Sequence, residues 1–281
     1  MKSFHIDSQL DYDVLEQTLF VFNLAVASTD SQRARAEAVT TEPALEIDEF
    51  TDAGGLNRFI RVNVPPGPFI MRYQATIDLD PPAVDELAPE VPLAHVPGAA
   101  LPYVLASRYC EADLLFALAC REFGALQSGY RRVQAVCQWI RDNIKYQIGT
   151  SSPLTTARDV LANRVGVCRD FAHLAVAFCR ALNIPARFVT GYARYNDPPP
   201  DFHAVFEAYL GNRWYLFDPT QLSPLDEIVR IGTGRDAAEV AFATFFGSAR
   251  MRRLAPLVEP AEQGTELVSL QTPAAGILLA A

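Results

Sequence analysis

Six prolines fall between Asp80 and Pro102, and they divide the chain into two parts with different sequence periods. Proline lacks a backbone N–H and has a fixed φ, so this stretch cannot form a regular helix or a central strand. We interpret residues 81–107 as a linker between an N-terminal domain, residues 1–80, and a second domain, residues 108–281. A length of 281 residues fits two domains.

The part before the linker has the period of β-strands. Apolar and polar residues alternate from Met71 to Leu79, and Ile60, Val62 and Val64 repeat the pattern upstream. A period of two is typical of a half-buried strand. Between the two runs lies PPGP, residues 65–68, a turn that suits antiparallel strands. We therefore predict an antiparallel β-sandwich for residues 1–80.

The part after the linker has the period of helices. EADLLFALACREFG and YRRVQAVCQWIRDNIKY place apolar residues three and four apart, as amphipathic helices do. GVCRDFAHLAVAFCRALNIP predicts another helix from about Cys168 to Leu182, closed by Pro185. With strands further on, the fold class is α+β.

The net charge and the cysteine content limit which binding partners and which cellular compartment we expect. The chain has 33 acidic and 24 basic residues, a net charge of −9, so we expect no nucleic-acid partner. We interpret its basic cluster, Arg250, Arg252 and Arg253, as a solvated face near the end of a helix. No apolar run approaches the roughly 20 residues that span a bilayer. Five cysteines without CxxC spacing favour reduced thiols, so we expect a soluble cytoplasmic protein with no membrane partner.

Cys168 lies in the first turn of its predicted helix. Free backbone N–H groups and the positive end of the helix dipole favour a thiolate there and could stabilise an oxyanion. A lone cysteine is more often a buried structural residue, as we expect for Cys179. Cys168 therefore needs partners before it can be assigned a role.

The partners lie in a predicted hairpin, DFHAVFEAYLGNRWYLFDPT. With Gly211 and Asn212 as a two-residue turn, Val205 opposes Asp218, and His203 becomes the diagonal neighbour of Asp218 on the same face. A three-residue loop would instead place the two side chains on opposite faces or force a bulge. The shorter loop lets a carboxylate orient an imidazole that acts as a base.

Cys168, His203 and Asp218 thus form a candidate set for nucleophilic acyl transfer: nucleophile, base and orienting carboxylate. A metal site with His173 is disfavoured, because five helical positions separate Cys168 and His173 by roughly 140°. We expect His173 at the surface or loosely packed. Neither a metal nor another cofactor is expected, since no carboxylate-rich calcium loop is present.

Other residues near these segments have plainer explanations. Asp170 complements the helix dipole or orients the local loop. Tyr146 or Gln147 could supply a second oxyanion donor, and the sequence leaves that role open.

These segments resemble the transglutaminase-like superfamily, in particular its bacterial branch of proposed cysteine proteases. GVCRDFAHLAVAFCRALNIPAR is similar to the nucleophile helix of that family, DFHAVFEAYL to its histidine strand and RWYLFDPT to its aspartate strand. The resemblance implies a papain-like α+β catalytic domain with an N-terminal β-domain, and it gives Cys168, His203 and Asp218 the roles of a triad. Val205 departs from the family pattern, which often has an aromatic residue there.

The function that follows is cysteine-dependent cleavage of an amide bond in a peptide or protein through a thioester. A peptidase or amidase is favoured over an acyl transferase, because water needs no second binding site. The alternative is an inactive scaffold of the same fold that acts as a protein-binding module. Substrate identity and oligomeric state remain open.

Overall fold

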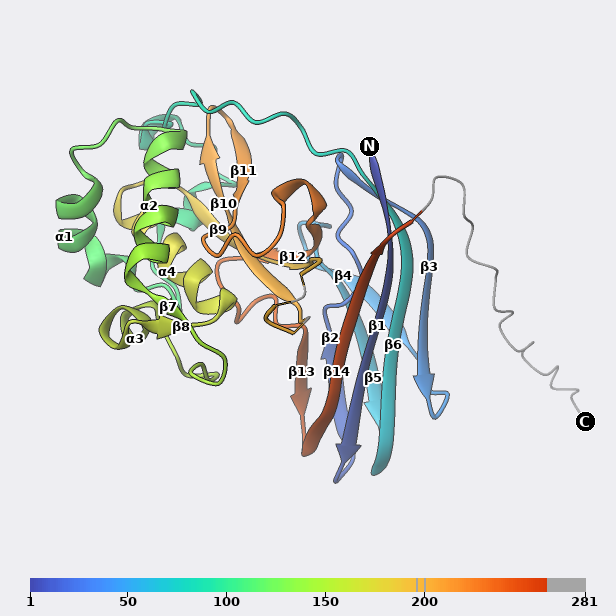
Figure 1. Ribbon diagram of the computed structural model, residues 1–281. Coiled ribbons are helices and arrows are strands. Elements are labelled where there is room, and N and C mark those ends of the chain that lie inside the picture. The colour runs from blue at the N-terminus through green and yellow to red at the C-terminus, as the bar shows by residue number, and fades with distance from the viewer. Residues whose placement is uncertain (196, 200, 262–281) are drawn as a thin grey trace, which may run out of the picture.

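A β-sandwich and a mixed α/β unit lie side by side in the protein (Figure 1). The structure is a computed structural model that describes residues 1–195, 197–199 and 201–261. The rest of the predicted second domain, residues 262–281, lies outside the described residues.

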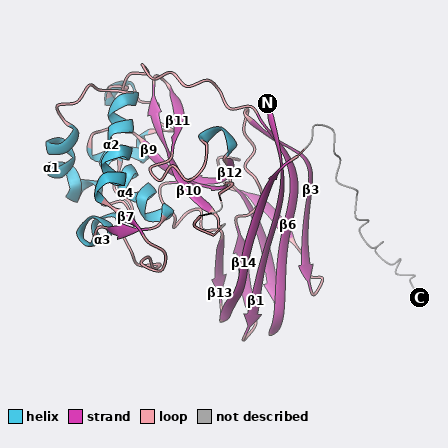
Figure 2. Ribbon diagram, in the orientation of Figure 1, coloured by secondary structure: helices cyan, strands magenta, loops and turns pink. Residues whose placement is uncertain are grey.

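Two antiparallel sheets of four strands make the sandwich (Figure 2). One sheet has the order β14–β1–β6–β3, and the other has the order β13–β2–β5–β4. The strands of the first sheet are β14 (Ala249–Pro260), β1 (Lys2–Val14), β6 (Gly67–Leu79) and β3 (Gln32–Glu42). Those of the second are β13 (Ala243–Phe246), β2 (Thr18–Phe22), β5 (Arg58–Val64) and β4 (Asp48–Thr51).

Strands β5 and β6 confirm the alternating pattern of the sequence. The alternating apolar positions that the sequence identifies in these strands are buried: Ile60, Val62, Val64, Met71, Tyr73, Ala75, Ile77 and Leu79. The turn at residues 65–66 does not join a hairpin, however, because β5 and β6 belong to different sheets. It carries the chain across the core from one sheet to the other.

The sandwich takes strands from both ends of the chain. Strand β13 pairs with β2, and β14 pairs with β1, so residues 243–260 complete the two sheets. The division predicted from the sequence placed these residues with the second domain, and it expected Arg250, Arg252 and Arg253 near the end of a helix. They lie on β14 instead. A four-residue strand such as β13 is too short for a sequence period to reveal its partner.

The α/β unit is built around one buried helix. Helix α4 (Cys168–Ala181) packs against α1 (Ala112–Phe123), α2 (Tyr130–Asn143) and α3 (Ala157–Asn163), and on its other side it covers a four-stranded sheet. Every residue of α4 from Asp170 to Ala181 is buried, including its charged ones. The sequence pattern predicts one apolar face for this helix, but the structure buries all of its faces. Among the described residues, no helix is long and apolar enough to cross a membrane.

The sheet under α4 is antiparallel and has the order β11–β10–β9–β12. Its strands are β11 (Arg213–Phe217), β10 (His203–Leu210), β9 (Ala186–Tyr192) and β12 (Val229–Gly234). A separate parallel pair, β7 (Lys145–Tyr146) and β8 (Val165–Gly166), lies just before α4. The described residues also include three short 3₁₀ helices, at Leu93–His95, Leu101–Val104 and Leu225–Glu227.

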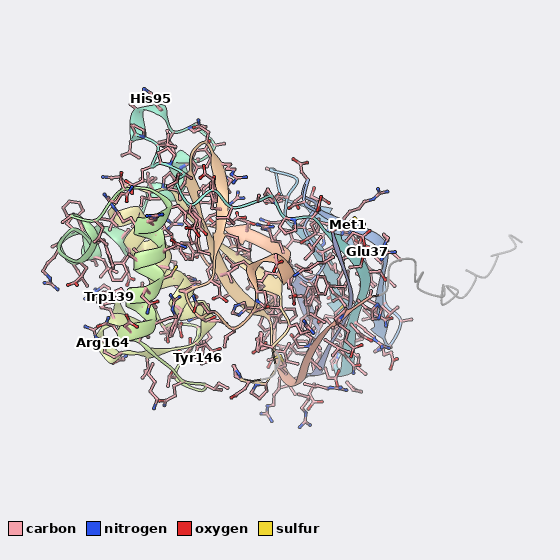
Figure 3. The ribbon with its side chains drawn as sticks, turned by 45° about the horizontal axis from the view of Figure 1, so that its top comes forward. Met1, Glu37, His95, Trp139, Tyr146 and Arg164 are labelled. Carbon is pink, nitrogen blue, oxygen red and sulfur yellow. The ribbon has the colours of Figure 1, made fainter. Side chains whose placement is uncertain are left out.

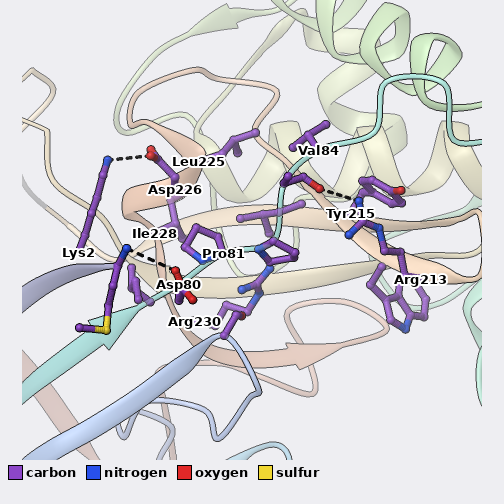
Figure 4. A pocket seen from close by; sticks show the side chains of 17 residues that line it. Lys2, Asp80, Pro81, Val84, Arg213, Tyr215, Leu225, Asp226, Ile228 and Arg230 are labelled. Carbon is purple, nitrogen blue, oxygen red and sulfur yellow. Dashed lines mark hydrogen bonds and ion pairs between the residues drawn. The ribbon is translucent and has the colours of Figure 1, made fainter.

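The proline-rich segment runs from the sandwich over the α/β unit, and a cavity of about 410 Å³ lies beneath its first residues (Figure 4). Its walls come from both units. The Nη2 group of Arg213 donates to the Ala83 carbonyl at 2.7 Å, and the Lys2 ammonium lies 2.7 Å from Asp226. The linker is thus held down on the outer end of β11.

Two side-chain amides join the sandwich to the edge strand of the α/β sheet. Gln32 accepts from the Arg230 N–H at 2.7 Å and donates to the Arg230 carbonyl at 2.8 Å. Asn57 makes the same two bonds with Thr233, at 2.7 and 2.8 Å. Each amide pairs with β12 as a neighbouring strand would, so the sandwich supplies partners for the N–H and carbonyl groups of Arg230 and Thr233 on this edge.

Candidate active site

Cys168 is the first residue of helix α4, and its position is fixed by the residues around it. A Cβ atom on Gly166 would lie 2.8 Å from the Cβ of Asp170, so only glycine fits there. Asp170 accepts from the Val167 N–H at 2.9 Å and from the Ser151 hydroxyl at 2.9 Å. The carboxylate of Asp170 therefore caps the helix and anchors the preceding loop. Orienting this loop is one of the two roles that we considered for Asp170 from the sequence; the other is complementing the helix dipole.

The hairpin has the predicted two-residue turn. Leu210 pairs with Arg213, Tyr209 pairs with Trp214, and the two turn residues have φ of 52° and 67°. Positive φ at both positions suits a glycine and an asparagine, as in the tight turns that match strand twist. The register continues to Phe206 opposite Phe217. His203 and Asp218 therefore lie on one face at the open end of the hairpin.

The two side chains form a buried ion-pair geometry. His203 Nε2 lies 2.9 Å from Asp218 Oδ2, with side-chain exposures of 0% and 2%. The other oxygen of Asp218 accepts from the Thr220 N–H and hydroxyl at 2.7 and 2.6 Å. Burial opposes ionisation of Asp218, but the His203 and Thr220 hydrogen bonds prevail and lower the pKa of its carboxyl.

The environment of His203 favours its charged form. Burial lowers the pKa of the imidazole, but the contacts with Asp218 and then with the Cys168 thiol outweigh burial and raise the pKa to about 10. Nε2 is used by Asp218, and Nδ1 has no hydrogen-bond partner among the described residues. Nδ1 is therefore the nitrogen available to the thiol. The Cys168 sulfur itself is partly buried and donates to the Phe202 carbonyl at 3.9 Å.

Two tyrosines complete the surroundings of the thiol. Tyr146 lies on β7 (Figure 3). It is close enough to Cys168 to interact with both its thiol and its backbone amide. Burial and the thiol raise the pKa of Tyr146, so its hydroxyl stays a donor at neutral pH. The Tyr195 ring meets the His203 ring edge-on at 5.5 Å. Tyr195 escaped prediction because it follows a strand and has no periodic signal.

The remaining thiols do not share this environment. Cys110, Cys137 and Cys179 are buried, and burial raises the pKa of each. Cys120 is exposed on α1. Cys179 thus lies in the core, as predicted.

His173 differs from its prediction, because it is completely buried. Its ring lies between Tyr109 and Phe188, with centroids 5.0 and 4.6 Å away. Nε2 accepts from the Ala237 N–H at 3.1 Å, and burial lowers the pKa of the imidazole to about 3. The prediction failed because α4 is buried on all sides, so no position on it from Asp170 to Ala181 is exposed to solvent. In the described part of the chain, no group of three or more His, Cys, Asp or Glu side chains is arranged to hold a metal ion.

Comparison with known proteins agrees with this architecture. Residues 116–219 match the model of the transglutaminase-like superfamily, and residues 1–99 match that of the bacterial transglutaminase N-terminal domain. A solved structure of a proposed cysteine protease from Cytophaga hutchinsonii is 41% identical, covers 94% of this chain and 92% of its own, and superimposes with a TM-score of 0.90.

Two mycobacterial proteins without assigned function are also similar. One from Mycobacterium tuberculosis is 28% identical over 238 residues, which cover 74% of this chain and 75% of that protein. One from Mycobacterium leprae is 33% identical over 122 residues, which cover 40% of this chain and 42% of that protein. The alignment thus spans less than half of the M. leprae protein.

The family and the Cytophaga hutchinsonii structure together support a cysteine-based hydrolase or transferase in general. The predicted α+β fold, with an N-terminal β-domain before a transglutaminase-like unit, is confirmed. Because a relative above 40% identity is matched along almost its whole length, the assignment does not rest on the motifs alone. This chain belongs to the transglutaminase-like superfamily.

Proposed function

We propose that the protein is a cysteine-dependent hydrolase of amide bonds in peptides or proteins, with Cys168 as nucleophile, His203 as base and Asp218 as the residue that orients His203. One observation carries this proposal: the thiol at the start of α4 lies beside an imidazole whose other nitrogen is held by a buried carboxylate. This is the arrangement that nucleophilic acyl transfer requires.

In the first half of the reaction, the Cys168 thiolate, paired with the charged imidazole of His203, attacks the carbonyl carbon of the amide. The resulting tetrahedral oxyanion collapses to a thioester as His203 gives the proton to the departing amine. In the second half, His203 removes a proton from water, which attacks the thioester and releases a carboxylic acid. The Cys168 thiolate leaves, and the proton taken from water stays on His203, which regenerates the starting pair.

The oxyanion has two donors within reach of the attacking sulfur. The backbone N–H of Cys168 is one of the free amides in the first turn of α4. The Tyr146 hydroxyl, kept protonated by its surroundings, is the other. We therefore assign to Tyr146 the role of second donor, which the sequence left open between Tyr146 and Gln147.

Water is the acceptor that we favour over an amine, because it needs no second binding site. The five free cysteines suit a reducing compartment, and we propose the cytoplasm as the place of action.

The test is to trap the acyl-enzyme with a set of peptide amides and activated esters and to locate the adduct by mass spectrometry. We expect an acyl group on Cys168 in the wild type and none in Cys168→Ala. Adding an alkylamine separates the two acceptors: the free acid dominates for a hydrolase, and the new amide dominates for a transferase. If the thiol forms no adduct with any ester, the alternative of an inactive protein-binding module is favoured instead.

A further inference from the structure

Among the residues that the structure describes, strand β13 is an open edge of the sandwich. It lies at the end of the order β13–β2–β5–β4, and in this part of the chain it pairs on one side only, with β2. The outer side of an edge strand presents alternate N–H and C=O groups that are free to pair with another chain.

Natural proteins usually protect such edges with charges or prolines, and β13 lacks both. The other three edge strands of the sandwich all carry charged residues: β3 with Arg33, Arg35, Glu37 and Glu42, β4 with Asp48 and Glu49, and β14 with Arg250, Arg252, Arg253 and Glu259. Strand β13 reads Ala-Thr-Phe-Phe, and its two aromatic residues, Phe245 and Phe246, are 41% and 64% exposed. Among these four edges, β13 is the one without a charged residue, so it opposes the pairing of an uncharged strand least.

This edge begins next to the candidate active site. Phe242, the residue before β13, stacks on Phe202 with ring centroids 5.0 Å apart and an interplanar angle of 17°. The carbonyl of Phe202 is the group that the Cys168 sulfur contacts at 3.9 Å. From there β13 runs along the sandwich away from the α/β unit (Figure 1). The start of β13 therefore lies close to the residue that contacts the thiol, so a chain that pairs with β13 can extend from there toward Cys168.

We infer that β13 is the docking strand for the substrate: an extended, uncharged polypeptide segment adds to the sandwich as a further strand and so presents its amide bond to Cys168. The segment gains main-chain hydrogen bonds from β13 and an apolar contact from Phe246, as in other cases of strand addition. The inference rests on the proposed function and specifies how its polypeptide substrate binds: as an extended segment paired with a strand of the sandwich. It also gives the sandwich a role in the reaction.

The test compares three peptide reagents on a Cys120→Ser background, so that Cys168 is the accessible thiol. One is an acetylated hexapeptide of alternating alanine and valine with a C-terminal chloromethyl ketone, whose methylene carbon bonds to the sulfur with loss of chloride. The other two reagents are the same hexapeptide with its odd or its even amide nitrogens methylated. Because only alternate amides face the docking strand, we expect one methylated form to react about tenfold more slowly and the other to react normally.

Matched variants test the strand itself. Phe246→Lys places a charge on the edge, and Phe116→Lys places one at a residue that is 54% exposed on α1. We expect the first to slow the unmethylated peptide reagent about tenfold and the second to leave it unchanged. Iodoacetamide, which needs no docking, should react equally with both variants. Equal rates for all peptide reagents and for both variants would overturn the inference.

Two further measurements keep this inference separate from the proposed function. If the thiol is inert to every reagent, the proposed function fails, and binding of the unreactive hexapeptide amide to Cys168→Ala is then followed by hydrogen exchange. Added protection at residues 243–246 supports docking, and its absence overturns it. If the wild type is a dimer that Phe246→Lys dissociates, the edge is covered by a second copy of the chain, and the inference is wrong.

Discussion

His203 Nε2 and Asp218 Oδ2 lie 2.9 Å apart with almost no exposure to solvent, at the open end of a hairpin closed by Gly211 and Asn212. The pair is a consequence of the turn length, because one more residue in the loop would place the two side chains on opposite faces. It determines both which nitrogen of His203 is free and how the site responds to pH.

The first prediction concerns that response. Folding raises the pKa of His203 from 6.5 to about 10, so the stability contributed by the charged imidazole is complete below about pH 6.5 and is lost as the pH rises towards 10. Asp218 has a lowered pKa, so its contribution is present at neutral pH and is lost in acid. Asp218→Asn should remove this dependence.

Urea unfolding at pH 6 and pH 9.5 measures the effect. The free energy of unfolding of the wild type should fall more between the two pH values than that of Asp218→Asn. Parallel changes in the two proteins would mean that the pair does not hold a charged imidazole.

The second prediction separates the hydroxyl of Tyr146 from the reactivity of the thiol. Tyr146→Phe should slow acylation of Cys168 by p-nitrophenyl acetate about a hundredfold, because that reaction develops an oxyanion. Alkylation by iodoacetamide develops none and should keep its rate. A similar loss in both reactions would show that Tyr146 acts through the thiol or the fold.

A third prediction concerns the start of α4. Asp170→Ala removes the buried acceptor of the Val167 N–H and the Ser151 hydroxyl, so we expect a loss of about 2–3 kcal/mol in the free energy of unfolding. Asp159→Ala is the matched control, since Asp159 caps α3 in the same way but at an exposed position. It should cost about 1 kcal/mol or less. Equal losses would contradict the importance of the burial of Asp170.

The fourth prediction tests the junction between the two units. Asn57→Ala leaves the N–H and carbonyl of Thr233 without partners, which should cost about 2–4 kcal/mol. Gln138→Ala, which removes an exposed amide on α2, should stay within about 0.5 kcal/mol of the wild type. Chemical denaturation of both variants gives the comparison, and no difference between them would show that the amide contributes nothing to the junction.

Local patterns explain why much of the fold and the site could be predicted. The alternation of Met71, Tyr73 and Ala75 identifies a strand with one buried face, and the Gly211-Asn212 pair specifies the turn that aligns His203 with Asp218. The position of Cys168 at the start of a helix follows from the glycine before it and from the long apolar segment after it. These features depend on residues close together in the sequence.

Other features depend on contacts between distant segments, which a period cannot show. Strand β13 is recognised as a strand only through β2, which lies more than 200 residues earlier. His173 is buried because helices and a sheet surround α4 on every side, whereas its own neighbours predict a partly exposed position. The contacts of Tyr195 with His203 likewise arise only after β9 and β10 have paired.

The most direct test of the central claim is the pH dependence of iodoacetamide alkylation at Cys168, with the exposed Cys120 of the same molecule as an ordinary thiol. Mass spectrometry of the two peptides gives both rates from one sample. We expect Cys168 to react at least about tenfold faster than Cys120 near pH 6, and His203→Ala to abolish this difference without changing the rate of Cys120. Equal rates for the two thiols across the pH range in the wild type would contradict an activated nucleophile at Cys168.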